Sequence, residues 1–536
     1  MPLNISSASE RGGVRSTSRR SFANWLRLSL PPQPRSVAVF AVFFFSLASN
    51  LWAGNSPLAD AVESTDRAAI RRLLEAHADV NAPQSDGMTA LHWAVYHDDL
   101  ETIKLLLHAK ADVKTENRYG VTPLSLACVN GNGVVVESLV AAGADVNSTL
   151  RGGETILMTA ARAGKVGAVK ALLAAGANLN AKDRKGQTAI MWAAADGHVA
   201  VVQMLVDTGA DFRTPLDSGF TPFFFAVREG RIEVARALLK AGVDVNDVMQ
   251  PKKVNGKSVR KGTSALVLAV ENGHFDLALA LLEAGADPND QRSGYSALHV
   301  MTWVRKPVRG DGDDGDPPPI GSGKLSSLQF VRKLVEHGAD VNAPLKSGRS
   351  GPGLFSKVGV TPFFLASSTA DTAYMHLLVE LGAKPLVNNA DKCTPLMAAT
   401  GIGIGGQAAD ETAGTEPEVI EAIQYLLELG ADVNAVDANG ETAMHGAAYK
   451  NLPKVVQLLT DKGAKVEAWN HKNKYGWTPL LIAQGYRPGN FKPSAETVVA
   501  IEKVMLAQGV TPPTSSASSA GNAAAYEGVE TKKRAP

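Results

Sequence analysis

Two short segments carry the residue types of a ligand site. Residues 401–406 read GIGIGG, and glycines at this spacing can bring backbone N–H groups close to a phosphate. A dinucleotide-binding loop needs a strand before it and a helix after it, whereas this segment follows an expected helix. We therefore interpret residues 401–406 as an inserted loop.

The second segment, residues 309–316, reads RGDGDDGD. Its aspartates, from Asp311 to Asp316, could converge on Ca²⁺, because closely spaced carboxylates suit a hard cation. The segment lacks the spacing of an EF-hand and the glutamate that closes such a site. We expect a solvated loop, and calcium binding here stays open.

No arrangement of residues in the sequence indicates catalysis. GxSxG and HExxH are absent, and no serine, histidine and acid occur in a recognisable nucleophile setting. Cys128 and Cys393 lie 265 positions apart, which excludes a disulfide scaffold and a cysteine-based metal site. We expect a protein that is not an enzyme and that needs no metal and no cofactor. The alternative is an enzyme whose site lies in an insertion, with residues 303–323 as the best candidate.

One recurring phrase predicts the elements that would position any site. TALHWA, TPLSLA, TILMTA, TAIMWA and TPFFFA begin at threonines 33 residues apart, and six later residues take the same slot. These eleven capping residues are Thr89, Thr122, Thr155, Thr188, Thr221, Ser264, Ser296, Thr361, Thr394, Thr442 and Thr478. Each can cap the start of a helix, and the proline that follows five of them suits the first helical turn. A second apolar run then predicts a second helix, which ends at a glycine.

Helix pairs of this size cannot bury their apolar faces alone, so successive pairs must stack. The 33-residue period with T-P-L-H-x-A resembles the ankyrin-repeat family from Leu58 to Val510, and the chain is similar to exported bacterial members of it. The resemblance implies an all-α repeat fold, an ankyrin solenoid of about eleven helix–turn–helix units with β-hairpin fingers. It also implies protein partners, and histidines (His92, His299 and His445) that brace neighbouring fingers.

Two positions depart from the repeat where its second helix should end. His77 and Lys110 stand where later repeats have glycine. Because φ > 0 is disfavoured for such residues, we expect these two helices to fray more readily than the others. A further glycine stands two residues before the capping slot in ten of the eleven repeats, with Lys392 as the exception.

Changes of composition and of repeat length divide the chain. We expect residues 1–53 to be a signal segment with a basic n-region, 54–510 the solenoid, and 511–536 a disordered tail rich in Ser, Ala and Pro. The solenoid carries insertions at 249–262, 304–324, 344–359, 401–417 and 485–495. The first and third lengthen fingers, and the other three lengthen the turn between paired helices.

The N-terminal segment has the order of a secretory signal. Arginines precede an apolar run, Val37 to Ala48, which small residues follow. About 12 apolar residues are too few for a comfortable bilayer span. We expect export to the periplasm or the cell exterior, and an uncleaved inner-membrane anchor formed by 37–52 is the alternative. Residues 18–22 resemble a twin-arginine signal, so the export route is open.

Local charge and aromatic side chains indicate how the solenoid would bind. The net charge of +1, from 54 basic and 53 acidic residues, excludes recognition by whole-molecule charge, and we expect no nucleic-acid partner. The residue four positions before the capping slot is basic in seven of eleven repeats, which predicts a basic row along the fingers. The positions seven and eight after the capping slot face the concave groove in ankyrin proteins, and here they include Tyr, Arg and Trp, which are common in interfaces.

We therefore predict a monomeric scaffold or adaptor that binds a protein through the concave groove and the basic fingers, which would fit an acidic partner surface. The predicted contact residues are Tyr96, Arg118, Arg151, Arg162, Arg184, Arg228, Lys252, Lys253, Lys257, Arg260, Lys261, Trp303, Leu354 and Phe355. Two alternatives account for the same residues: the basic row is only a row of solvated charges, and the groove positions are an unused variable surface. The sequence alone does not choose between binding and these alternatives. An alternative function is a secreted effector that acts on another organism's proteins.

Overall fold

The computed structural model describes residues 56–253, 259–307, 319–348, 354–403, 414–486 and 493–513. Within them the chain forms 25 helices, which are twelve stacked pairs and one short extra helix, α24. The first helices of the pairs are α2 (Pro57–Glu63), α4 (Ala90–Tyr96), α6 (Pro123–Asn130), α8 (Ile156–Arg162), α10 (Ala189–Asp196), α12 (Pro222–Arg228), α14 (Ala265–Glu271), α16 (Ala297–Arg305), α18 (Pro362–Ser368), α20 (Pro395–Thr400), α22 (Ala443–Tyr449) and α25 (Pro479–Ala483). The second helices are α3 (Arg67–Glu75), α5 (Leu100–His108), α7 (Gly133–Ala141), α9 (Val166–Ala174), α11 (Val199–Asp207), α13 (Ile232–Lys240), α15 (Phe275–Glu283), α17 (Ser327–Glu336), α19 (Thr372–Glu380), α21 (Glu416–Glu428), α23 (Pro453–Asp461) and α26 (Ala495–Ala507), and α24 is Val466–Trp469.

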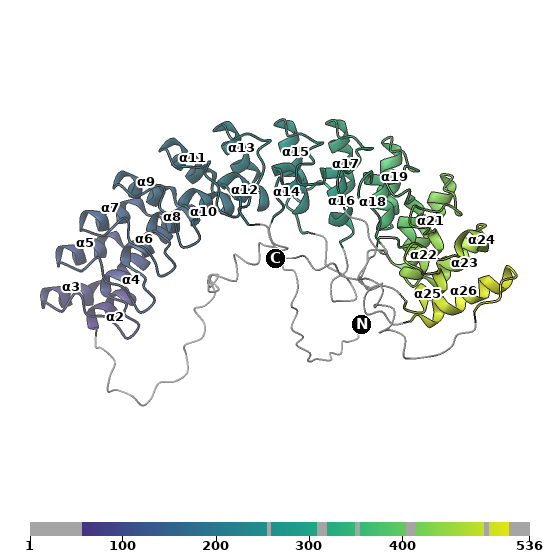
Figure 1. Cartoon of the computed structure of the whole chain (residues 1–536). Coiled ribbons are helices and arrows are strands. Elements are labelled where there is room, and N and C mark those ends of the chain that lie inside the picture. Colours follow the sequence, from purple (N-terminus) through teal and green to yellow (C-terminus); the bar gives the residue numbers. More distant parts are fainter. Residues whose placement is uncertain are drawn as a thin grey trace, which may run out of the picture.

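The pairs stack into an arc, with the first helix of each pair on its inner side and the second on its outer side (Figure 1). This confirms the predicted all-α ankyrin solenoid. The twelfth pair is the N-terminal α2–α3, which precedes the first of the eleven capping residues. At its start, the side chain of Ser56 makes no capping bond.

All eleven capping residues stand at the start of a first helix, as the sequence predicts, although the side chains of Thr188 and Ser296 make no capping bond. In α12, the Thr221 hydroxyl accepts a hydrogen bond from Phe224 N, and Pro222 follows in the first turn. In α4, the His92 ring bonds Thr89 at one edge and lies 3.0 Å from Val121 O of the next finger at the other. The predicted histidine brace is therefore present at His92, whereas the outer ring nitrogen of His445 is buried without a partner.

The second helices end in left-handed residues, as predicted. Gly143 has φ of 99°, and its N–H donates to Val140 O. His77 and Lys110 make the same turn with φ of 54° and 64°, so their side chains are accommodated in a conformation that costs about 1–2 kcal/mol for L-residues. Lys392, at the finger glycine slot, likewise has φ of 61°.

The β-hairpin part of the prediction is not confirmed. The first finger turns over Gln84 to Met88, where Gln84 N donates to Met88 O at 2.8 Å and Gly87 N donates to Gln84 O at 2.9 Å. One such pair of bonds closes a turn without building a strand ladder. In the described residues, β-bridges occur singly, as at Thr149 and Thr155 and at Val248 and Ser264.

A row of asparagines, which is not among the predicted features, ties neighbouring pairs together behind the fingers. Asn342 donates to Gly382 O at 3.1 Å and accepts from Lys384 N at 2.7 Å in the next repeat. The members that accept from the next repeat in this way are Asn81, Asn147, Asn180, Asn246, Asn289, Asn342 and Asn434. The slot holds Lys114, Arg213, Leu386 or Glu467 in other repeats, so the row is broken there.

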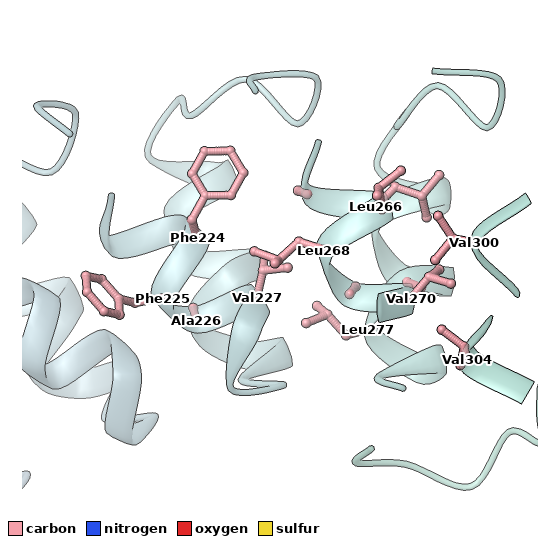
Figure 2. Close-up of a cluster of buried hydrophobic side chains, with 14 of the residues drawn as sticks. Phe224, Phe225, Ala226, Val227, Leu266, Leu268, Val270, Leu277, Val300 and Val304 are labelled. Carbon is pink, nitrogen blue, oxygen red and sulfur yellow. The ribbon is translucent and has the colours of Figure 1, made fainter. Parts of the chain in front are cut away.

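One apolar core runs the length of the arc, because each first helix packs against the first helix of the next pair. Around α12 and α14, Phe224, Val227, Leu266 and Leu268 are all nearly fully buried (Figure 2). Aliphatic side chains fill the layer between neighbouring pairs, as Val270 of α14 and Val300 of α16 do in Figure 2. Stacking buries the apolar face that an isolated pair would expose.

The helix bounds show where the long connections lie. Residues 306–326, 401–415 and 484–494 join paired helices, and the fingers before α14 and α18 are long. The return of the first connection is fixed on α15, where Ser322 N donates to His274 Nδ1 at 2.9 Å and Lys324 N donates to Asp276 Oδ2 at 2.8 Å. The expected signal segment, Asp311 to Asp316, and residues 404–406 and 514–536 lie outside the described residues.

Candidate protein-binding surface

The inner face of the arc is open over its N-terminal half. We define the inner face by the residues seven and eight positions after each capping residue, at the ends of the first helices. Tyr96 is 53% exposed and Val129 is 51% exposed at this position in α4 and α6. Their neighbours His97, Asn130 and Asp196 are exposed as well, and Arg162 is half-buried. These side chains form an accessible surface across α4, α6, α8 and α10.

The same positions are half-buried at the end of α18, and they are buried just after α20 and at the end of α22. Ile402, Tyr449 and Lys450 are 1%, 1% and 4% exposed. Tyr449 and Lys450 were expected in the groove because of their position in the repeat. Exposure returns only at the end of the solenoid, where Tyr486 lies at the surface. The inner face therefore has an open half and a closed half.

A long finger closes part of the inner face. Phe355, from the finger before α18, is 9% exposed and packs edge-on against Phe364 at 4.9 Å between ring centroids. Its ring also lies against Gly403, in the turn that follows α20, where a β-carbon would overlap it. Ser356 N donates to Asp391 Oδ2 at 2.9 Å, and Asn389 donates to Ser356 O at 2.7 Å. Phe355 is thus a buried anchor, and its prediction as a contact residue is wrong.

The connections between paired helices close the rest. Gly414, on the return of the second connection, lies on Ala370 and beside Lys450. Lys306 pairs with Glu418, which ties the connection after α16 to the start of α21 across 112 residues. Arg305 makes two bonds to Asp371, at 2.7 and 2.9 Å, and both side chains are largely buried. Charge-assisted bonds of this kind are strong where water is excluded, so they hold the end of α16, where the first connection begins, against the start of α19.

Arginine side chains lie over aromatic rings at several points of the inner face. The Arg162 guanidinium lies 5.4 Å from the Trp192 ring centroid, which links α8 to α10. Arg228 is 6% exposed, because it lies between the rings of Phe220 and Phe225 and pairs with Glu229. Burial lowers the pKa of Arg228, and the nearby Glu229 carboxylate opposes that shift. Arg228 is a core residue, so its prediction as a contact residue is wrong.

Two aromatic residues and two cations gather around α16, between the open half and the closed half. Arg260 lies 5.3 Å from the Tyr295 ring and 5.6 Å from the Trp303 ring, and it pairs with Glu271. Lys357 donates to the Tyr295 hydroxyl at 2.7 Å. We call Arg260, Tyr295, Trp303 and Lys357 the aromatic–cation cluster. The sequence placed Arg260 and Lys357 in one basic row and Trp303 in the groove, and the structure joins them.

The basic row along the N-terminal fingers is exposed at Arg118, Arg151 and Arg184. Arg151 donates to Arg118 O at 2.8 Å, and its side chain lies over the glycine of the preceding finger. Within the described residues, none of these three arginines has a carboxylate within ion-pair distance. They leave uncompensated positive charge beside the open half of the inner face.

Part of the positive charge on the long finger before α14 is paired, although the composition of this finger includes no acid. Lys252 pairs with Asp217 at 2.6 Å, and this contact lowers the pKa of the Asp217 carboxyl. Lys253 and Lys261 are exposed, and Lys257 lies outside the described residues. Leu354, in the other long finger, is partly exposed.

The described residues show no metal-site geometry, because no three His, Cys, Asp or Glu side chains converge there. Burial raises the pKa of Cys128 to about 12, so this thiol is a poor nucleophile near neutral pH. None of the helices in the described ranges is long and apolar enough to cross a membrane, and residues 37–52 lie outside those ranges.

Known proteins match this chain through its repeats. A family profile described as "Ankyrin repeats (3 copies)" matches residues 58–150, 107–183, 157–249 and 413–492, and one described as "Ankyrin repeat" matches 261–293. Human "Ankyrin repeat and SOCS box protein 6" is 31% identical over 112 residues, which are 19% of this chain and 27% of that protein. "Neurogenic locus notch homolog protein 1" of Xenopus tropicalis is 34% identical over 161 residues, 30% of this chain and 5% of that protein. Human "SH3 and multiple ankyrin repeat domains protein 2" is 31% identical over 179 residues, 30% of this chain and 9% of that protein.

The similarity to these relatives spans less than a third of the length of each of them, so it concerns the repeats alone. The matches of the first profile cover more than half of the 536 residues. They fall on the helix pairs that the structure stacks into the arc. The chain belongs to the ankyrin-repeat family.

Proposed function

We propose that this protein is a binding module for another protein and that the open half of its inner face holds the partner. The observation that supports this most is the contrast in exposure along one repeated position, from 53% at Tyr96 to 1% at Tyr449. Solvent-exposed Tyr and Val at successive repeats give an apolar contact surface with little side-chain entropy to lose. Trp93 and His97 pack around the Tyr96 ring and hold it in place.

The partner surface that fits is acidic. Arg118, Arg151 and Arg184 lie beside the open half without carboxylate partners among the described residues. Complementary charge at the rim of an interface speeds association and excludes partners of the wrong sign. The expected monomeric state is consistent with this scheme, because a single chain supplies the whole surface.

Affinity capture with wild-type protein and two variants tests the proposal. Tyr96→Ala should weaken the captured complex by about 5- to 30-fold, which corresponds to about 1–2 kcal/mol for a central aromatic contact. Tyr486→Ala is the matched control, because it removes an exposed tyrosine from the other end of the inner face. Equal effects of the two changes would contradict the proposal.

We also propose that the protein is exported by its N-terminal segment. The composition of residues 1–53 supports this, with arginines before the apolar run and small residues after it. Sequencing the N-terminus of the protein purified from its source tests it. A mature chain that begins near Gly54 is expected, and an intact Met1 would contradict cleavage.

A further inference from the structure

The aromatic–cation cluster lies around α16, between the open half of the inner face and the closed half. Trp303 is the inner-face residue of α16, and the next inner-face residue, Val304, is already buried. Beyond it, Gly414 covers Ala370, and the Phe355 finger covers Gly403. A segment that follows the inner face from α4 and continues past the half-buried Glu271 and Asn272 of α14 reaches this cluster before it meets the closed half.

The charges of the cluster do not cancel. Arg260 is paired with Glu271, so this pair contributes no net charge. Lys357 is exposed and bonds only the neutral Tyr295 hydroxyl, with its ammonium 5.4 Å from the ring centroid. Among the described residues it has no carboxylate within ion-pair distance. One positive charge is left, held in place by an aromatic ring.

The rings give the site a fixed shape. Tyr295 and Trp303 contact each other edge-on, with ring centroids 5.0 Å apart, and Arg260 lies against both. Cations stacked on rings keep donors free at their edges, and a bound carboxylate accepts charge-assisted hydrogen bonds from such donors. A monoanion balances the single excess charge, whereas a phosphate carries about −1.5 to −2 at pH 7.

We propose that the aromatic–cation cluster is a subsite for the carboxylate of a Glu or Asp side chain in the partner segment bound along the open half. Lys357 supplies the attractive charge, and Tyr295 and Trp303 pack against the aliphatic part of the acidic side chain. This inference rests on the proposed function, because it assigns one contact within the same surface.

A peptide titration with the full chain tests the subsite. The probe is a fluorescein-labelled hexaglutamate peptide with an amidated C-terminus, and the comparison peptide is hexaglutamine, both followed by fluorescence anisotropy at low ionic strength. Hexaglutamate should bind at least about tenfold more tightly than hexaglutamine. Equal binding of the two peptides, or no binding of hexaglutamate, would overturn the proposal.

Two charge reversals locate the contact. Lys357→Glu should weaken hexaglutamate binding at least about tenfold, and Lys357→Arg should keep most of it. Lys474→Glu is the matched control, because Lys474 is exposed at the same slot of the finger before α25, beyond the closed half. It should change binding less than about twofold. Equal losses in Lys357→Glu and Lys474→Glu would show general attraction to charge and overturn the subsite.

Two further outcomes separate the sources of the anion and the two proposals. Binding that requires a free peptide C-terminus would assign the subsite to a terminal carboxylate and overturn the side-chain assignment. If Tyr96→Ala weakens binding of the captured partner, while Lys357→Glu changes binding of neither that partner nor hexaglutamate, the subsite is refuted and the proposed function stands.

Discussion

Replacing Glu441 by Gln should change how stability depends on pH. Glu441 is fully buried, and its Oε1 accepts bonds from the Tyr449 hydroxyl and from Asn473, both at 2.8 Å. Its Oε2 is buried without a partner. Burial, with the nearby Asp437 carboxylate, raises the pKa of Glu441 from 4.5 to about 7, against the opposing effect of the Tyr449 bond. Gln accepts the same two bonds and has no charge to bury.

The magnitude follows from the two pKa values. Between pH 4.5 and about 7, the unfolded chain has released this proton and the folded chain keeps it, so unfolding becomes easier as the pH rises. At about 1.4 kcal/mol per pH unit, wild type should lose about 3 kcal/mol relative to Glu441→Gln across this window, with no further change above it. The loss acts on the repeats that contain α22 and α25.

Hydrogen exchange of peptides from α22 and α23 measures this effect, after correction for the intrinsic pH dependence of exchange. Local opening energies are the suitable readout, since a long solenoid need not unfold in one step. The free energy of opening in wild type should fall relative to the Gln variant from pH 4.5 to 7. Parallel profiles for the two proteins would refute the burial argument.

Three further changes follow from the packing. Leu386→Asn should add two hydrogen bonds to the broken asparagine row, to Gly430 O and Asp432 N, and raise the free energy of unfolding by about 1 kcal/mol. Urea titration measures this change, and an unchanged unfolding midpoint would contradict it. Lys110→Gly should relieve the left-handed conformation of this residue and stabilise the folded chain by about 0.5–1 kcal/mol, after the larger entropy loss of glycine is deducted. Amide hydrogen exchange at the end of α5 should become slower, and faster exchange there would contradict the prediction. Phe355→Ala should lower the free energy of unfolding by about 3 kcal/mol or more and expose the inner face near α20 to proteolysis. An unchanged cleavage pattern near α20 would contradict the role of Phe355 as an anchor.

The repeat itself could be predicted from the sequence, because its signals are local. Thr221 and Pro222 start a helix through contacts within four residues, and each glycine end needs only its own turn. The asparagine row could also have been predicted, since Asn342 and its equivalents recur four residues after the cap glycine. Its bonds were missed because they join one repeat to the next.

The closed half could not be predicted, because its contacts join segments without a common period. Phe355 lies in an insertion, and nothing in the sequence pairs it with Gly403. Lys306 and Glu418 are 112 residues apart. Arg228 is different, because the two rings that cover its guanidinium, Phe220 and Phe225, stand within eight residues of it in the sequence, so its burial could have been predicted.

The most direct test of the binding surface is photo-crosslinking of the partner. A photoreactive phenylalanine analogue placed at Tyr96 or Val129 should crosslink the captured protein, because both positions are exposed in the open half. The same analogue at Tyr486, exposed beyond the closed half, should give no crosslink to it. Crosslinking at Tyr486 with none at Tyr96 or Val129 would contradict the assignment of the open half as the binding surface.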